Sequence, residues 1–215
     1  MNFTVNILGT ASALPKAERY PSAQVLNVRG RLFMIDCGEG TQVAMRKFNT
    51  GFKTVDIICI THLHGDHIYG LPGLLATIGN SNRTEPLTII GPKFIKAVIE
   101  TAILPITYVP FDIIVIESPL KKMEVLKSGE GLKVLELNNE KNAEIVLSTI
   151  ELEHSSPCLG YSFYLNRKPK FILEKAINNQ VPREIWKTLQ HGETVRNENR
   201  VFTPDMVLGE DRKGI

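Results

Sequence analysis

The sequence predicts a mixed α/β (α+β) fold, and three observations carry that prediction. The 215 residues are 43% hydrophobic and 22% charged, which is the composition of a globular protein with a buried core. Residues 55–60 form a continuous apolar run rich in β-branched side chains, typical of a strand buried on both faces. Segments with helical patterns, such as residues 71–78, follow strand-like segments along the chain.

The individual elements follow from apolar periodicity and from turn residues. Strands are predicted over residues 3–8, 24–28, 31–35, 55–60, 87–90, 112–117, 132–137, 144–153 and 159–165. Helices are predicted over residues 41–48, 71–78, 91–104 and 182–189. Arg29-Gly30 separates the second and third strands, so these two strands are expected to form a hairpin.

The chain changes character after residue 165. Residues 166–200 are polar and basic, and we expect them to have too little apolar content for a core of their own. This segment is therefore predicted to be a projecting arm or a flexible excursion.

Charge and cysteine content bear on the partners of the protein and on its cellular compartment. The net charge is +2 and the pI is about 8.4, which permits an anionic partner without requiring one. The three cysteines, Cys37, Cys59 and Cys158, are far apart and form no CxxC pair, so reduced thiols and a cytoplasmic location are expected. Neither a signal peptide nor a membrane-spanning segment is predicted.

A cluster of metal-binding side chains follows the buried strand at residues 55–60. His62, His64, Asp66 and His67 occupy six positions in the segment ITHLHGDHIYG. Imidazole and carboxylate groups are ligands for zinc, and mixed sets of them also suit manganese or iron. An isolated histidine is usually a core or surface residue, whereas this density of donors favours a metal. One short loop of this kind can supply ligands to two adjacent ions. Such a pair suits phosphodiester hydrolysis, because bound metal lowers the pKa of water and generates a hydroxide nucleophile near neutral pH.

Four stretches resemble the metallo-β-lactamase superfamily and, within it, the tRNase Z (RNase Z) family. They are LGTASALPKAERYPSAQVL (8–26), IDCGEGTQ (35–42), THLHGDHIYGLPGLL (61–75) and LEHSSPCLGYSF (152–163). The resemblance implies an αββα sandwich, of which residues 1–165 would form the N-terminal half. Residues 166–208 would be the basic exosite arm, and residues 209–215 would begin the C-terminal half.

The resemblance also implies a reaction and a set of ligands. His62, His64 and His154 would hold one zinc ion, while Asp66 and His67 would hold a second. Asp66 would also orient or deprotonate the attacking water. Precursor tRNA would be cut past the discriminator nucleotide by a homodimer, leaving a 3′-hydroxyl on the tRNA and a 5′-phosphate on the trailer.

Two further regions have roles that rest on the same resemblance. Asp36, in the glycine-rich turn, is expected to brace the loop beside the metals, with a plain turn residue as the alternative. The family's arm binds the tRNA elbow, and here Arg183 and Lys187 would contact phosphates while Trp186 would stack on a base. The alternative is that Trp186 packs a short amphipathic helix against the body of the protein.

The sequence departs from the family pattern in its later part. The family uses a bridging Asp and a late His after the arm. In this sequence the histidines and aspartates after His154 are His191, Asp205 and Asp211. We therefore expect little cleavage by the 215-residue chain, and exposed sheet edges that need a partner. It would be a fragment of a longer enzyme, one product of a split gene, or a natural inactive short form.

Two other functional classes stay open. The first is a different metallo-β-lactamase-fold phosphodiesterase or hydrolase, although a small substrate needs no basic arm. The second is a non-catalytic RNA-binding fragment, which the absent ligands favour. Metal content per chain separates the second from an enzyme.

Overall fold

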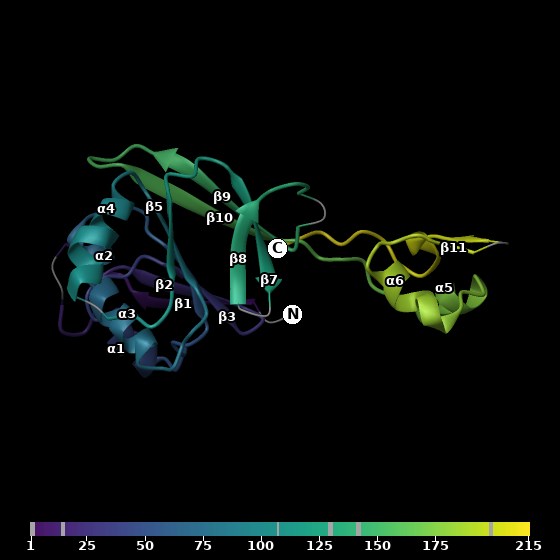
Figure 1. Cartoon of the computed structure of the whole chain (residues 1–215), viewed down its shortest axis with the longest axis horizontal. Coiled ribbons are helices and arrows are strands. Elements are labelled where there is room, and N and C mark those ends of the chain that lie inside the picture. Colours follow the sequence, from purple (N-terminus) through teal and green to yellow (C-terminus); the bar gives the residue numbers. More distant parts are fainter. Residues whose placement is uncertain (1–2, 14–15, 107, 129–130, 141–142, 198–199) are drawn as a thin grey trace. The chain divides into compact units, whose positions relative to one another are not determined.

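Figure 1 shows the computed structural model of the chain, which describes residues 3–13, 16–106, 108–128, 131–140, 143–197 and 200–215. The chain divides into two compact units, Met1–Phe163 and Tyr164–Ile215. None of the helices in the described residues is long and apolar enough to cross a membrane.

The first unit contains a six-stranded sheet in which the strands follow one another in sequence order. Its strands are β1 (Phe3–Gly9), β2 (Ala23–Val28), β3 (Arg31–Ile35), β4 (Val55–Cys59), β5 (Leu87–Gly91) and β6 (Ile113–Glu117). β1, β2 and β3 are antiparallel, whereas β3 to β6 are parallel. All five residues of β4 are buried, so the predicted strand is covered on both faces. Arg29 and Gly30 have φ values of 54° and 85°, which suit the tight turn of the predicted hairpin.

Helices cover one face of this sheet. They are α1 (Thr41–Lys47), α2 (Gly65–Ile68), α3 (Leu71–Gly79) and α4 (Ile95–Val98), and α4 continues as a π-helix (Ile99–Ile103) and a 3₁₀ turn (Leu104–Ile106). Met34 and Ile58 of the sheet share a buried cluster with Ala44 of α1 and Leu74 of α3. The long helix predicted over residues 91–104 is shorter at its start, because Gly91 completes β5.

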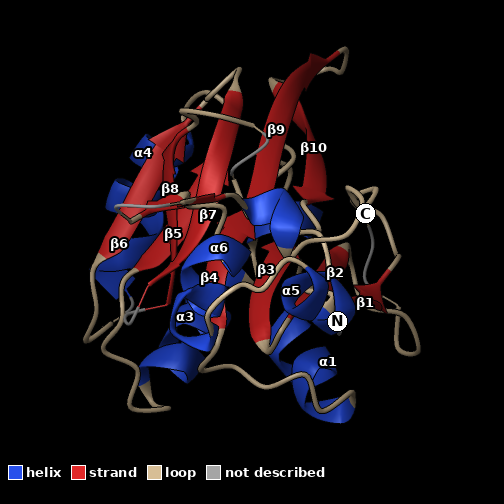
Figure 2. Cartoon of the chain, turned by 90° about the vertical axis from the view of Figure 1, so that its right-hand side faces the viewer, coloured by secondary structure: helices blue, strands red, loops and turns tan. Residues whose placement is uncertain are grey.

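A four-stranded sheet with the order β10-β9-β7-β8 packs on the other face. Its strands are β7 (Lys122–Ser128), β8 (Gly131–Glu136), β9 (Ile145–Leu152) and β10 (Cys158–Leu165), and Figure 2 shows β9 and β10 side by side. The rings of Phe33 and Phe163 join the two sheets edge to face, with centroids 5.1 Å apart. The layers are therefore helix, sheet, sheet, as expected for the first part of an αββα sandwich. β7 was not predicted, because only Met123 and Val125 of its lysine-rich sequence turn inward.

Apolar side chains remain exposed on the edge strand β1. Val5 pairs with Leu26, which pairs with Phe33, so these three side chains lie on the face that packs against the second sheet. Val5 is nevertheless 50% exposed and its neighbour on the same face, Ile7, is 59% exposed. The sequence analysis expects exposed sheet edges, and β1 is an edge strand of the six-stranded sheet.

The second unit has a small core, which corrects the prediction that the arm has none. Its elements are α5 (Leu173–Asn178), a 3₁₀ turn (Arg183–Ile185), α6 (Trp186–Gln190), β11 (Val195–Arg196), β12 (Val201–Phe202) and a 3₁₀ turn (Pro204–Met206). The buried cluster consists of Ala176, Val181, Leu189, Phe202, Val207 and Leu208. The prediction for residues 166–200 is wrong because half of the core residues come from the following segment, after residue 200. The backbones of Leu165 and Ile215 exchange two hydrogen bonds, so the chain enters and leaves this unit at adjacent positions.

Candidate metal centre

The predicted donor cluster begins where β4 ends. His62 and His64 lie in the extended segment after Cys59, and His64 has φ −69° and ψ 148°. Alternate residues of an extended chain point to the same side, so both rings project together. Asp66 and His67 follow in the short helix α2, which turns their side chains back toward His62. The centroids of the His62 and His67 rings are 4.0 Å apart.

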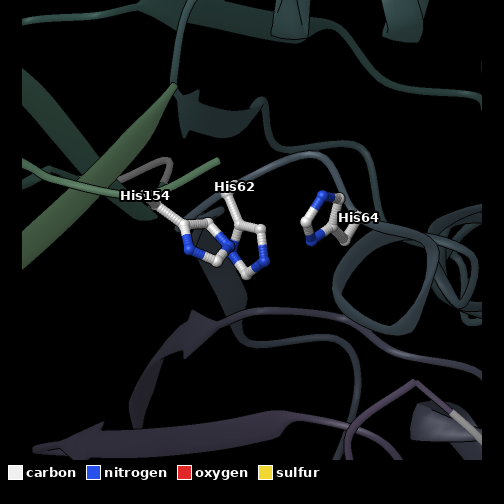
Figure 3. A group of neighbouring side chains, drawn as sticks. All are labelled: His62, His64 and His154. Carbon is white, nitrogen blue, oxygen red and sulfur yellow. The ribbon is translucent and has the colours of Figure 1, made fainter. Parts of the chain in front are cut away.

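His154 joins this group from a distant part of the chain. It follows β9 and precedes β10, and its ring centroid lies 4.6 Å from that of His62 and 5.3 Å from that of His64. One nitrogen from each of His62, His64 and His154 lies within 4.8 Å of the other two. Figure 3 shows these three side chains together. Among the described residues, the structure thus gathers three imidazoles that suit one tetrahedral cation with bonds of about 2.0–2.1 Å.

The electrostatics around His62 favour a neutral ring. Burial, followed by the nearby His67, His154 and His64, lowers the pKa of His62 to about 4. A neutral imidazole offers a lone pair to a cation near neutral pH. The hydroxyl of Thr61 lies 3.0 Å from Nδ1 of His62 and also contacts Asp36, so Nδ1 can hold the ring proton and leave Nε2 as the donor atom.

Asp36 is buried and occupies the centre of a hydrogen-bond network. Its carboxylate accepts from the Thr61 backbone N–H at 2.8 Å, the Thr61 hydroxyl at 2.9 Å and the Ser22 hydroxyl at 3.3 Å. Its Oδ2 also lies 2.7 Å from Nδ1 of His67. Asp36 therefore fixes both the start of the histidine loop and the orientation of one of its rings. The structure gives this residue the contacts that a loop-bracing role requires.

Asp66 and His67 form a second pair of donors beside the three histidines. In this pair, Nε2 of His67 lies 3.5 Å from Oδ2 of Asp66. Burial lowers the pKa of His67, but the hydrogen bond to Asp36 and the negative charges of Asp36 and Asp66 raise it by more. The net shift of the His67 pKa is therefore upward. Burial raises the pKa of Asp66, and the Ala13 backbone N–H and His67 outweigh that effect, so this carboxyl stays ionised.

The glycine-rich turn at residues 36–40 packs directly against this loop. A side chain at Gly38 would place its Cβ 2.4 Å from the carbonyl oxygen of Asp66, and one at Gly70 would lie 2.0 Å from the carbonyl oxygen of Gly38. The two glycines allow the turn and α2 to approach this closely. This contact packs the IDCGEGTQ stretch (35–42) directly against the histidine loop.

Two contributors to the site were not singled out from the sequence. Thr61 contacts Asp36, His62 and His67, and its place directly before the first histidine was the available signal. Tyr161 donates a hydrogen bond to the carbonyl of Ile60, and nothing in its local sequence indicates that contact. His191, Asp205 and Asp211 belong to the second unit.

The arm residues predicted to bind RNA also lie together within the second unit. Arg183, Trp186 and Lys187 line an open concavity, whose other lining residues are Lys168, Pro169, Phe171, Gln190 and His191. The guanidinium of Arg183 lies 5.7 Å from the centroid of the Trp186 ring. The indole N–H of Trp186 donates to Val181, and its ring packs on Phe171. Trp186 is thus partly buried and packs against the small core, while Arg183 and Lys187 are exposed.

Two packed sheets with helices on one face, and clustered histidines at the ends of their strands, define the metallo-β-lactamase fold. Residues 3–105, less than half of the chain, match the family model described as Anti-Pycsar protein Apyc1. The Ribonuclease Z of Alkaliphilus oremlandii (strain OhILAs) is 54% identical over 98% of this chain and 67% of the relative. The Ribonuclease Z of Clostridium novyi (strain NT) is 48% identical over 98% of this chain and 66% of the relative.

Solved structures agree with this assignment. The short form of human tRNase Z matches with a TM-score of 0.56 and 34% identity, covering 74% of this chain and 62% of that one. The chain belongs to the ribonuclease Z family. It spans about two thirds of the length of the curated relatives it matches.

Proposed function

We propose that this chain carries the metal-binding part of a tRNA 3′-processing endoribonuclease. The enzyme would cut precursor tRNA past the discriminator nucleotide, leaving a 3′-hydroxyl on the tRNA and a 5′-phosphate on the trailer. The observation that carries the proposal is the convergence of His62, His64 and His154 beside Asp66 and His67. The printed names of the relatives, Ribonuclease Z and tRNase Z, support the substrate class.

The donor chemistry supports zinc as the metal. His62, His64 and His154 would hold one ion, and Asp66 with His67 would supply part of a second position. When bound, zinc supplies Lewis acidity that lowers the pKa of water and stabilises developing negative charge on phosphate oxygens. The three-imidazole set fits zinc better than magnesium or calcium, which favour oxygen ligands.

Asp66 is the residue proposed to handle the proton of the attacking water. Its carboxylate is ionised because the Ala13 N–H and His67 stabilise the negative charge, so it can accept a hydrogen bond from water and orient it. The hydrogen bond from Ala13 at 2.8 Å fixes one carboxylate oxygen. The side chain is therefore held in place before substrate binds.

Arg183 and Lys187 are proposed to contact tRNA phosphates from the concavity in the arm. Lys168 lines the same concavity and adds a third positive charge. A binding surface of this kind recognises shape and backbone charge, which suits an enzyme that acts on many tRNA sequences. Trp186 would form a wall of the concavity and stack on a base.

The assembly and the compartment are also proposals. We propose a homodimer, as the family resemblance implies, and the exposed Val5 and Ile7 on β1 are consistent with a surface that needs cover. We propose a cytoplasmic location, which the three free cysteines support. Sedimentation of the purified chain tests the first of these two proposals.

The donors present in this sequence complete one metal position and only part of a second. We propose that the 215-residue chain binds one zinc ion firmly and cleaves precursor tRNA weakly or not at all. This expectation keeps the non-catalytic RNA-binding alternative testable. Two firmly bound zinc ions and robust cleavage by the purified chain would contradict it.

Zinc binding and tRNA binding, measured separately, test the proposal without relying on cleavage. The purified chain should bind zinc by competition with a chromogenic chelator, and it should bind precursor tRNA in a salt-dependent manner. Deletion of residues 166–200 should abolish tRNA binding and leave zinc binding intact. A chain that binds zinc and turns over small phosphodiesters, yet ignores tRNA, would instead support the phosphodiesterase alternative.

A further inference from the structure

The position of His154 depends on how β10 is attached to the first sheet. His154 lies in the short connection between β9 and β10, whereas His62 and His64 follow β4. The three rings therefore come from two different sheets. Any relative movement of the sheets changes the distance between His154 and the other two histidines.

Polar contacts tie β10 to the residues directly before His62. The backbone N–H of Leu159 donates to the carbonyl of Thr61 at 2.8 Å. The hydroxyl of Tyr161 donates to the carbonyl of Ile60 at 2.7 Å and lies 3.2 Å from the carbonyl of Ile90. Ile60 and Thr61 are the last two residues before His62, so these bonds join one ligand-bearing segment to the other.

Of these polar contacts from β10 to Ile60 and Thr61, the one made by the Tyr161 hydroxyl comes from a side chain, so a substitution can remove it. Leu159 contributes its backbone, which a point substitution leaves in place. Burial, followed by the neighbouring Cys59 and Asp36, raises the pKa of Tyr161 well above its ordinary value, so the phenol stays a donor. The Ile60 carbonyl lies at the end of β4, where the parallel sheet stops and the loop begins.

We propose that Tyr161 is a positioning residue for the metal centre: its hydrogen bond to the Ile60 carbonyl holds His154 at the distance where all three histidines can share one cation. The inference rests on the proposed metal-binding function. It assigns to Tyr161 a role distinct from that of Asp36, which braces the same loop from the β3 side. The second sheet is thereby set relative to the first by a bond adjacent to the ligands.

The test compares Tyr161→Phe with Tyr164→Phe, in the same strand. Both substitutions remove one phenolic oxygen, but the Tyr164 hydroxyl accepts an exposed hydrogen bond from the backbone N–H of Gly214, remote in sequence from the histidine loop. Zinc affinity is measured by chelator competition, and the visible spectrum of Co²⁺ reports ligand geometry. Tyr161→Phe should weaken zinc binding about tenfold and alter the Co²⁺ spectrum, whereas Tyr164→Phe should do neither.

A double-mutant cycle with His154→Ala separates positioning from a general loss of stability. If Tyr161 acts through His154, then Tyr161→Phe should change zinc affinity less than twofold once His154 is absent. Thermal unfolding in the presence of EDTA shows that each variant is folded. An effect of Tyr161→Phe that is equal in both backgrounds, or no effect on zinc affinity in the wild-type background, would overturn the inference.

The outcomes also distinguish this inference from the proposed function. If the wild-type chain binds zinc and Tyr161→Phe binds it equally well, the positioning role is wrong and the metal centre stands. If the wild-type chain binds no zinc with His62, His64 and His154 all present, both are wrong.

Discussion

The two units of this chain differ in how their charged residues are held. In the first unit, two aspartates are buried and each is fixed by several partners: Asp36 beside the histidines, and Asp56 beside Arg83. In the second unit, Arg183 and Lys187 are exposed around an open concavity, over a core of six buried residues. Chemistry at a metal requires fixed donors, whereas contact with a flexible polyanion tolerates mobile cations.

This difference predicts that substitutions in the two units have separable consequences. Changes at the buried aspartates or the histidines of the first unit should affect stability or metal binding and leave tRNA affinity unchanged. Changes at the exposed cations of the second unit should weaken tRNA binding and leave metal binding unchanged. A substitution that affects both properties equally would show that the division is wrong.

The largest effect is expected from Asp56→Asn, in the first unit. Asp56 and Arg83 are both fully buried and 3.1 Å apart, and Asp56 also accepts bonds from Arg31 and from the backbone of Leu132. Removing the negative charge leaves buried guanidinium groups uncompensated, which costs about 3–5 kcal/mol. Urea unfolding measures this loss.

The control for this change is Asp112→Asn, which removes an exposed aspartate just before β6. It should change the free energy of unfolding by less than about 0.5 kcal/mol. Equal losses for Asp56→Asn and Asp112→Asn would mean that the buried network contributes nothing specific to stability.

The next effect is expected from His64→Ala. Removing one of three imidazoles should weaken zinc binding about 100-fold, or about 2.7 kcal/mol, because one of the three bonds from the protein to the ion is lost. The affinity for precursor tRNA, measured by filter binding, should stay within about twofold. In a complete enzyme the same substitution should abolish cleavage.

His191→Ala provides the matched control, since this histidine lies in the second unit. It should retain full zinc affinity. If tRNA affinity of His64→Ala fell as far as zinc affinity, the separation between the metal centre and the RNA-binding arm would be refuted.

A smaller effect is expected from Arg183→Ala and from Lys187→Ala. Each removes one exposed positive charge from the concavity, so tRNA binding should weaken about fivefold, corresponding to about 1 kcal/mol. The slope of log affinity against log salt concentration should decrease in magnitude by about one, which corresponds to the loss of one phosphate contact. Zinc affinity should not change.

Lys47→Ala is the matched control, because it removes the same charge from an exposed position on α1. It should leave the salt slope unchanged. An identical decrease for Lys47→Ala would indicate that tRNA binding depends on net charge alone.

The contrast between the units also explains what the sequence revealed. Nearly all strands of the first unit were predicted, because a buried strand such as β4 needs an uninterrupted apolar run. His62, His64, Asp66 and His67 were found because they are adjacent in sequence, and His154 was found only through the family resemblance. Tyr161 was not predicted because its hydroxyl bonds the backbone carbonyl of Ile60, about a hundred residues earlier in the chain. A bond to a backbone atom leaves no pattern of side chains in the sequence.

In the second unit, the sequence signal was weaker for a physical reason. The small core takes single residues from several short elements, so no segment shows a continuous apolar periodicity. Val181 and Leu189 were separated from Phe202 and Val207 by a polar stretch, and the two halves were not joined. Leu173–Asn178 was missed as a helix because only Ala176 of that segment is buried.

The smallest expected effect comes from Trp186→Phe, which decides between the two roles of this side chain. The indole N–H donates to Val181 at 2.9 Å and the ring contacts Phe171, with centroids 5.2 Å apart. Phenylalanine keeps an aromatic ring for stacking but loses the hydrogen bond and part of the volume. If packing dominates, the second unit should lose about 1 kcal/mol of stability and become more sensitive to limited proteolysis, with tRNA affinity within about twofold. Trp186→Leu then completes the comparison: a further drop in tRNA affinity without a further drop in stability would show that the ring also stacks on a base.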